Sequence, residues 1–163
     1  MERPNDPLAA LPMTVDLNRL TGQVVLVGYG RVGRRIGEAF IANGISFVVA
    51  EENRDIVEQL RERDIPAVSG DAADPAVLIQ AHIQHARMLV IATPDTLNIR
   101  RMIEIARTVN PRIEIIVRTH SEEEAALLEK GNAGKVFFGE HELALAMTRH
   151  VLERFATAPE RQR

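Results

Sequence analysis

The chain has 163 residues, a formal net charge of −3 and no cysteine, and 45% of its residues are hydrophobic but only 4% aromatic. This composition predicts one soluble domain with an aliphatic core, as in a parallel sheet covered by helices. It excludes a basic surface for nucleic acid, disulfides and thiolate zinc sites, and no apolar run approaches the roughly 18 residues of a membrane span.

The first part of the chain, residues 1–21, contains Pro4, Pro7 and Pro12 and shows no sustained hydrophobic period. Such a segment is typical of a linker or a flexible arm. From residue 22 to residue 139, short apolar runs alternate with amphipathic segments of helical length. The runs that predict strands are Val24–Val27, Ser46–Ala50, Ala67–Ser69, Met88–Ala92, Ile113–Val117 and Lys135–Phe138.

Start and stop signals place helices between these strands. Gly44 suits the position after the first helix, Asp74 with Pro75 forms an N-cap followed by proline, and Ser121 with Glu124 has capping-box spacing. Right-handed helical crossovers between parallel strands build an open sheet with helices on both faces. We therefore predict a doubly wound, Rossmann-like α/β domain at 22–139, with six parallel strands in the order 3-2-1-4-5-6.

A last helix is predicted at 140–156, followed by a disordered tail at 157–163. Its apolar residues spread beyond the stripe that covers one face of a sheet: Leu143, Leu145, Ala146, Met147, Val151, Leu152 and Phe155. A helix buried on two sides within the monomer would have this pattern, but the chain that follows offers little to cover it. We therefore expect a crossover helix that forms a homodimer.

The loop from Gly28 to Gly33, Gly-Tyr-Gly-Arg-Val-Gly, joins the first predicted strand to the first helix. In a G-x-G-x-x-G loop, Gly28 permits a tight turn, Gly30 lets backbone amides approach a phosphate, and Gly33 lets helix and strand pack closely. The helix dipole favours an anion there, and Arg31 can add a charge-assisted contact. Alone, the motif also fits a flexible glycine turn.

Acidic and basic residues at later strand ends extend this candidate site. Glu51 follows the loop at about the 20-residue distance of the acid that bonds ribose hydroxyls, and it favours NAD or an adenosine nucleotide over NADP. For Glu51 and Glu52 the alternative is a solvated turn. Asp71 can bond adenine or orient its turn, and Arg118 can contact phosphate, a partner or only solvent. Gly70-Asp71-Ala72, Thr93-Pro94-Asp95 and Arg118 all face the same predicted crevice.

No catalytic or metal-binding residue is predicted. A dehydrogenase needs a second domain or long insertions to place substrate against nicotinamide, and the single tyrosine, Tyr29, lies inside the glycine loop. No Walker-type loop occurs, and His82 and His85 lack a third metal ligand. The enzyme alternatives are a small NAD(H)-dependent oxidoreductase, a nucleotide-sugar enzyme fragment and an S-adenosylmethionine-dependent methyltransferase.

From about Gln23 to Phe155 the sequence resembles the TrkA-N or RCK nucleotide-binding domain, particularly the cytosolic C-terminal domain of Kef-type cation/proton antiporters. The matching pieces are Val-Leu-Val-Gly-Tyr-Gly-Arg-Val-Gly at 25–33, the acid at 51, Ser-Gly-Asp-Ala at 69–72, Ala-Thr-Pro-Asp at 92–95 and Gly-Glu-His-Glu-Leu at 139–143. The sequence departs from the family in two respects. Glu51 stands where the family commonly has Asp, and the absence of a membrane segment implies a transporter fragment or a free-standing subunit.

The resemblance implies a regulator, not an enzyme, at the cytoplasmic face of the inner (plasma) membrane. It would bind AMP, ATP or NAD(H), gate potassium or other cation transport allosterically, and dimerise through its last helix. Its partner would be a membrane transport domain, in the same chain or in a separate subunit. The nucleotide contacts that it implies are Gly28, Tyr29, Gly30, Arg31, Val32, Gly33, Glu51, Asp71, Ala72, Thr93 and Arg118, to which we add Glu52.

Overall fold

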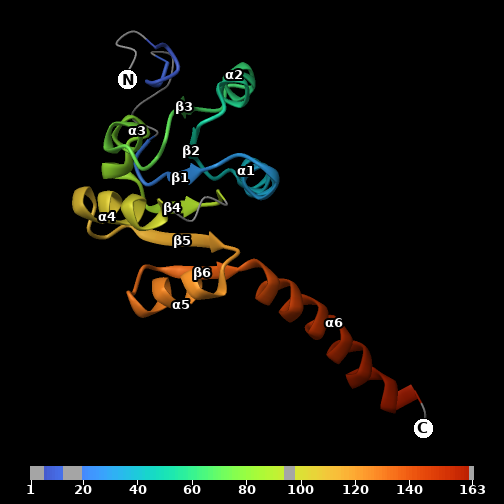
Figure 1. Cartoon of the computed structure of the whole chain (residues 1–163). Helices are drawn as coiled ribbons and strands as arrows, with labels where there is room; N and C mark the ends of the chain where they lie inside the picture. Colours follow the sequence, from blue (N-terminus) through green and yellow to red (C-terminus); the bar gives the residue numbers. More distant parts are fainter. Residues whose placement is uncertain (1–5, 13–19, 94–97, 162–163) are drawn as a thin grey trace.

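The computed structural model describes residues 6–12, 20–93 and 98–161, with side chains up to residue 156. One parallel sheet has the strand order β3-β2-β1-β4-β5-β6 (Figure 1), which confirms the predicted order. The strands are β1 (Val24–Val27), β2 (Phe47–Glu51), β3 (Ala67–Ser69), β4 (Met88–Ile91), β5 (Glu114–Thr119) and β6 (Lys135–Phe138).

Helices connect the strands and begin and end largely at the predicted signals. Asp74 accepts a hydrogen bond from the Ala76 amide with Pro75 at the first helical position, and Ser121 accepts one from the Glu124 amide. The helices are α1 (Arg31–Ala42), α2 (Arg54–Glu62), α3 (Pro75–Gln80), the short 3-10 helix η2 (Ile83–His85), α4 (Ile99–Val109), α5 (Glu122–Lys130) and α6 (Gly139–Arg161).

The sheet separates two apolar clusters because successive strand residues point to opposite faces. Leu26 packs in the cluster that contains Leu60 of α2 and is completed by α1. Val25 packs in the other, which contains Leu78 of α3 and Leu128 of α5. The buried, β-branched strands therefore hold helices on both faces of the sheet. Because the strands are parallel, their carboxyl ends all lie at the same end of the sheet.

The last helix, α6, extends away from the sheet after β6 (Figure 1). It runs to Arg161, beyond the end at 156 that we predicted. Its large apolar side chains are exposed, so the alternative of a helix buried on two sides within the monomer is wrong; they are Leu143, Leu145, Met147, Val151, Leu152 and Phe155. Across the described ranges, no helix has both the length and the hydropathy that a membrane span needs.

The described part of the expected flexible arm, residues 6–12, packs against the outer edge of the sheet. The Ser69 amide of β3 donates to the Leu8 carbonyl at 2.6 Å, and Leu8 is only 6% exposed. Arg61 of α2 donates to main-chain carbonyls of the same segment. For residues 6–12 these contacts correct the expectation of a flexible arm, one of the two alternatives for this segment.

Candidate functional site

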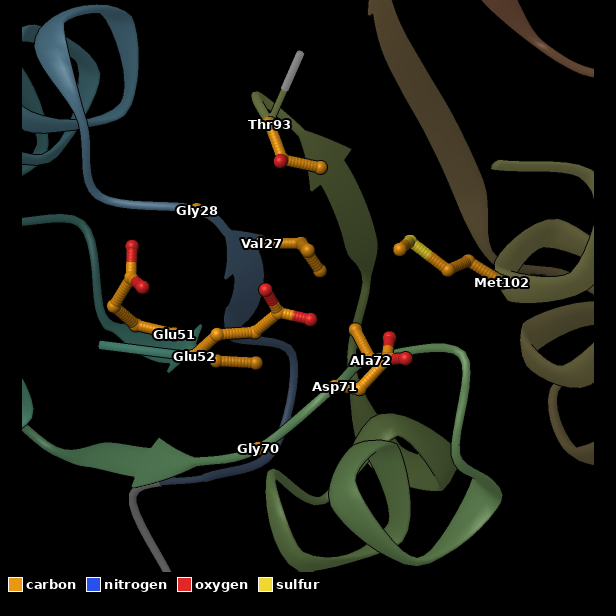
Figure 2. Close-up of a pocket in the computed structure, with 10 residues that line it drawn as sticks. Val27, Gly28, Glu51, Glu52, Gly70, Asp71, Ala72, Thr93 and Met102 are labelled. Atoms are coloured by element: carbon orange, nitrogen blue, oxygen red, sulfur yellow. The ribbon is translucent and has the colours of Figure 1, made fainter. Parts of the chain in front are cut away.

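A hollow opens at the carboxyl ends of β1, β2, β3 and β4. It lies where the strand order reverses beside β1, the place at which open α/β sheets bind ligands. Figure 2 shows the side chains from these strand ends and from α4 around it. The lining residues are Val27, Gly28, Ala50, Glu51, Glu52, Gly70, Asp71, Ala72, Thr93 and Met102.

The glycines of the first loop have different surroundings. Gly28 has a φ of +91°, and a Cβ there would lie 2.9 Å from the Thr93 nitrogen. A Cβ on Gly33 would lie 2.0 Å from the Gly28 carbonyl oxygen, whereas one on Gly30 would meet nothing within 4 Å. Gly28 and Gly33 are therefore required to build the turn, and Gly30 leaves open space in front of the helix.

The N-terminus of α1 lacks the side-chain cap that α2, α3 and α5 have. Its N-cap, Gly30, makes no such bond, and no acidic residue lies in its first turn. The first helical pairing is from the Arg34 amide to the Gly30 carbonyl at 2.9 Å, so the amides before Arg34 have no acceptor within the helix. Together with the helix dipole, these amides offer a site for an anion.

Glu51 links the glycine turn to the start of α2. Its Oε1 accepts from the Tyr29 amide at 2.9 Å, and its Oε2 accepts from the Asn53 amide at 2.6 Å. Glu51 is therefore held by main-chain amides of the two turns that it joins. A carboxylate has about four acceptor positions, so two remain for ligand hydroxyls. The Tyr29 amide, in contrast, is engaged within the protein, and an anion would use the amides from Gly30 onward.

The Tyr29 ring belongs to the core. It is 5% exposed and lies over Gly37 of α1, where a Cβ would come within 2.6 Å of the ring. Burial raises the pKa of the Tyr29 hydroxyl, and the negative charge of Glu38 raises it further. The side chain fixes α1 against the turn and does not line the hollow.

Loop contacts define the far side of the hollow. Asp71 Oδ1 accepts from the Ala73 amide at 2.8 Å, which supports its role in orienting the turn. Arg101 of α4 donates to the Ala73 carbonyl at 2.9 Å and ties the same loop to the helix that carries Met102. In Figure 2 the Glu52 carboxylate points toward the middle of this group.

The hollow brings together one part of the predicted site: Gly28, Glu51, Glu52, Asp71, Ala72 and Thr93. The other predicted residues do not line it: Tyr29, Gly30, Arg31, Val32, Gly33 and Arg118. Arg31 is exposed at the first position of α1, and Arg118 donates to the Ala92 carbonyl at 3.1 Å, next to Thr93. Pro94 and Asp95 lie outside the described residues.

Sequence reasoning missed the apolar wall formed by Val27, Ala50 and Met102. Val27 and Ala50 stand at or next to the last residue of a strand, a position that could have indicated them. No sequence signal indicates Met102, because it reaches the site through the packing of α4. Within the described ranges, no group of three or more His, Asp or Glu side chains is arranged to hold a metal ion.

The comparison with protein families decides how this geometry is classified. The model of the TrkA-N domain matches residues 24–139. The chain belongs to the TrkA-N domain family. It is 39% identical, over 140 residues and 86% of its length, to the putative cation/proton antiporter YbaL of Escherichia coli (strain K12), of which the match covers 24%. This TrkA-N chain thus spans about a quarter of that relative's length.

Solved structures show the same fold. The TrkA-N domain of the inner membrane protein ybaL from Escherichia coli matches with a TM-score of 0.75 at 39% identity, over 79% of this chain and 96% of that one. The Kef CTD of Shewanella denitrificans in AMP bound form gives 0.69 at 22% identity, over 82% and 80%. The GsuK channel bound to NAD gives 0.64 at 20% identity, over 82% and 23%. The last two show likeness of fold alone.

Proposed function

We propose that this TrkA-N domain is the nucleotide-sensing regulatory domain of a potassium or other cation/proton antiporter. The single observation that carries the proposal is the uncapped start of α1 beside Glu51, at the carboxyl end of β1. This arrangement offers amide donors for a phosphate at the start of α1, and a carboxylate for ribose hydroxyls in the hollow lined by Gly28 and Glu51. The proposed ligand is AMP or another adenine nucleotide, or NAD(H).

The residues around the hollow suit the parts of such a ligand. The open space in front of Gly30 would receive a phosphate, and the acceptor positions left on Glu51 would receive the ribose. Glu51 and Glu52 place negative charge where a 2′-phosphate would lie, which favours NAD over NADP. Val27 and Met102 supply the apolar surface that a base or nicotinamide ring needs.

The proposed partner is a membrane transport domain, in the same chain or in a separate subunit, at the cytoplasmic face of the inner membrane. The name of YbaL and its extent beyond this match support that partner. Different nucleotides would stabilise different geometries of a homodimer joined by α6. Their difference in binding free energy would then bias the transport domain. No catalytic step is part of this proposal.

Titration calorimetry with AMP, ADP, ATP, NAD and NADH tests the proposal. We expect at least one to bind, and we expect the substitution Gly30→Asp to abolish binding because it puts a negative charge in the open space before α1. Absence of binding to all five contradicts the proposal. Turnover of NADH with a carbonyl substrate would favour the oxidoreductase alternative, and competition between AMP and S-adenosylmethionine would favour the methyltransferase.

A further inference from the structure

The outer edge of the sheet, formed by β3 and α2, holds residues 6–12, which we call the docking arm. Arg61 of α2 is the centre of this contact. Its guanidinium donates to the carbonyls of Pro7 at 2.8 Å, Leu8 at 3.3 Å and Ala10 at 2.6 Å, and also to Ala67 of β3 at 2.9 Å. One side chain therefore joins the helix, the edge strand and the docking arm.

Three further contacts fix the docking arm. The Ser69 amide donates to the Leu8 carbonyl at 2.6 Å, so the arm satisfies an amide of the edge strand. The Leu8 side chain enters the cluster under α1 and α2. Asp6 accepts from the Leu8 amide at 3.0 Å and forms an ion pair with Arg54. The arm is thus held by its main chain, an apolar anchor and a charge.

Two of these anchor points, Ser69 and Arg54, lie close in sequence to residues of the candidate site. Ser69 directly precedes Gly70 and Asp71, which line the hollow. Arg54 directly follows Asn53, whose amide holds Oε2 of Glu51 at 2.6 Å. The docking arm therefore contacts the end of β3, which precedes the Asp71 turn, and the start of α2, which follows Glu51.

We propose that docking of residues 6–12 on the β3–α2 edge and binding of the nucleotide are coupled. The docked arm holds the Glu51 and Asp71 loops in the geometry that binds ligand, so its release weakens binding. Because coupling is reciprocal, ligand strengthens docking of the arm by the same factor. This coupling rests on the nucleotide site proposed above. It would connect nucleotide binding at that site to the position of residues 6–12.

The test compares the unmodified chain with Leu8→Asp, which removes the apolar anchor. The matched control is Leu127→Asp on α5, where Leu127 is 51% exposed at the opposite edge of the sheet. Hydrogen exchange of the Ser69 amide reports docking, and calorimetry with AMP and NAD reports binding. We expect Leu8→Asp to speed Ser69 exchange and to weaken nucleotide affinity about five-fold or more, a typical allosteric coupling, and Leu127→Asp to change neither.

The reciprocal measurement uses the unmodified chain and follows Ser69 exchange with and without saturating AMP. AMP should slow this exchange by the same factor by which Leu8→Asp lowers the affinity for AMP. Unchanged affinity in Leu8→Asp despite faster Ser69 exchange overturns the coupling alone. Rapid Ser69 exchange in the unmodified chain overturns docking of the arm. If the unmodified chain binds none of the nucleotides, the proposed function fails and the coupling with it, while Ser69 exchange still reports docking.

A second variant keeps the test valid if Leu8→Asp folds poorly. Asp6→Ala removes the ion pair with Arg54 and the acceptor for the Leu8 amide without changing a buried apolar group. We expect the same directions, with smaller changes in Ser69 exchange and in AMP affinity. A faster Ser69 exchange with unaltered AMP affinity in this variant overturns the coupling as well.

Discussion

A substitution at Gly30 should weaken ligand binding without destabilising the fold. The Gly30 backbone φ of −81° lies outside the left-handed region that favours glycine, and a Cβ there meets nothing within 4 Å. We therefore expect Gly30→Ala to change the free energy of unfolding by less than about 1 kcal/mol. The added methyl group occupies the space proposed for the phosphate, so AMP affinity should fall at least about ten-fold, about 1.4 kcal/mol, in calorimetry.

The neighbouring glycines supply the controls for this prediction. Gly33→Ala places a Cβ 2.0 Å from the Gly28 carbonyl oxygen and should destabilise the fold by about 3 kcal/mol or more in urea unfolding. Gly139→Ala also adds a methyl group in open space, at the start of α6, and should leave both stability and AMP affinity unchanged. AMP affinity in Gly30→Ala equal to that of the parent would show that the phosphate binds elsewhere.

Tyr29 gives the molecule a sensitivity to alkaline pH. Burial, aided by Glu38, raises the pKa of the Tyr29 hydroxyl in the folded state. The folded chain then holds this proton more tightly than the unfolded chain, so the stability that it contributes is complete below the unfolded pKa of about 10 and is lost as pH rises from there through the higher pKa of the folded chain. Urea unfolding between pH 8 and pH 11 should show a steeper loss of stability in the parent than in Tyr29→Phe. Parallel curves would contradict this prediction.

At the scale of elements, the strands could be predicted within one or two residues, and most clearly β1, β2 and β4, which are buried on both faces. The strand Val24–Val27 contains no polar residue that would obscure its bounds, and a glycine turn directly after it marks its end. Helix starts were predictable where a local capping side chain exists, as at Asp74 and Ser121. The predicted strand order is the usual one of dinucleotide-binding sheets with right-handed crossovers, and the location of the hollow follows from the reversal beside β1.

Features that depend on distant contacts could not be predicted from local patterns. Proline and the lack of periodicity indicated a free arm, but Arg61 contacts Pro7 and Ala10, which lie more than 50 positions earlier in the chain. Met102 reaches the hollow only because α4 packs across the sheet. The inward direction of Tyr29 follows from its packing on Gly37, which the motif does not encode.

Two nearby residues that precede α2 should have different roles: Asn53 caps the helix, and Glu51 belongs to the proposed ligand site. The Asn53 side chain accepts from the amides of Asp55 and Ile56 at 3.0 and 3.4 Å, whereas its main-chain amide donates to Glu51. Asn53→Ala should therefore cost about 1 kcal/mol of stability, the usual value of an N-cap, and keep AMP affinity within about two-fold. Glu51→Gln should weaken AMP binding strongly, because its amide nitrogen cannot accept a hydrogen bond, so the amide of Tyr29 or of Asn53 loses its partner and fewer acceptor positions remain for the ribose. A large loss of AMP affinity in a folded Asn53→Ala variant would contradict this separation.

At the scale of the whole molecule, the docking arm and α6 lie at opposite edges of the sheet (Figure 1). The arm covers β3, and α6 continues from β6. The hollow lies between them, at the ends of β1, β2, β3 and β4. The proposed nucleotide would contact elements that lead toward both edges, as the proposed regulatory role requires.

The exposed face of α6 predicts a homodimer in solution. Leu143, Met147, Val151 and Phe155 follow one another at four-residue steps and lie along one side of the helix, each at least 50% exposed. Few monomers leave such a row uncovered, and a second copy offers an identical row with which it can pack. Met147→Asp puts a charge in the middle of the row and should convert the dimer to monomer in sedimentation at micromolar protein.

The matched control for this prediction is Ala146→Asp, which adds the same charge on the side of α6 that carries Glu142 and Arg149. It should remain dimeric, because that side faces away from the apolar row. Neither variant should alter the unfolding of the sheet, since α6 leaves the body of the molecule after β6 (Figure 1). An unmodified chain that sediments only as monomer at micromolar concentration would contradict the dimer, and a monomeric Ala146→Asp variant would show that the contact uses another side of the helix.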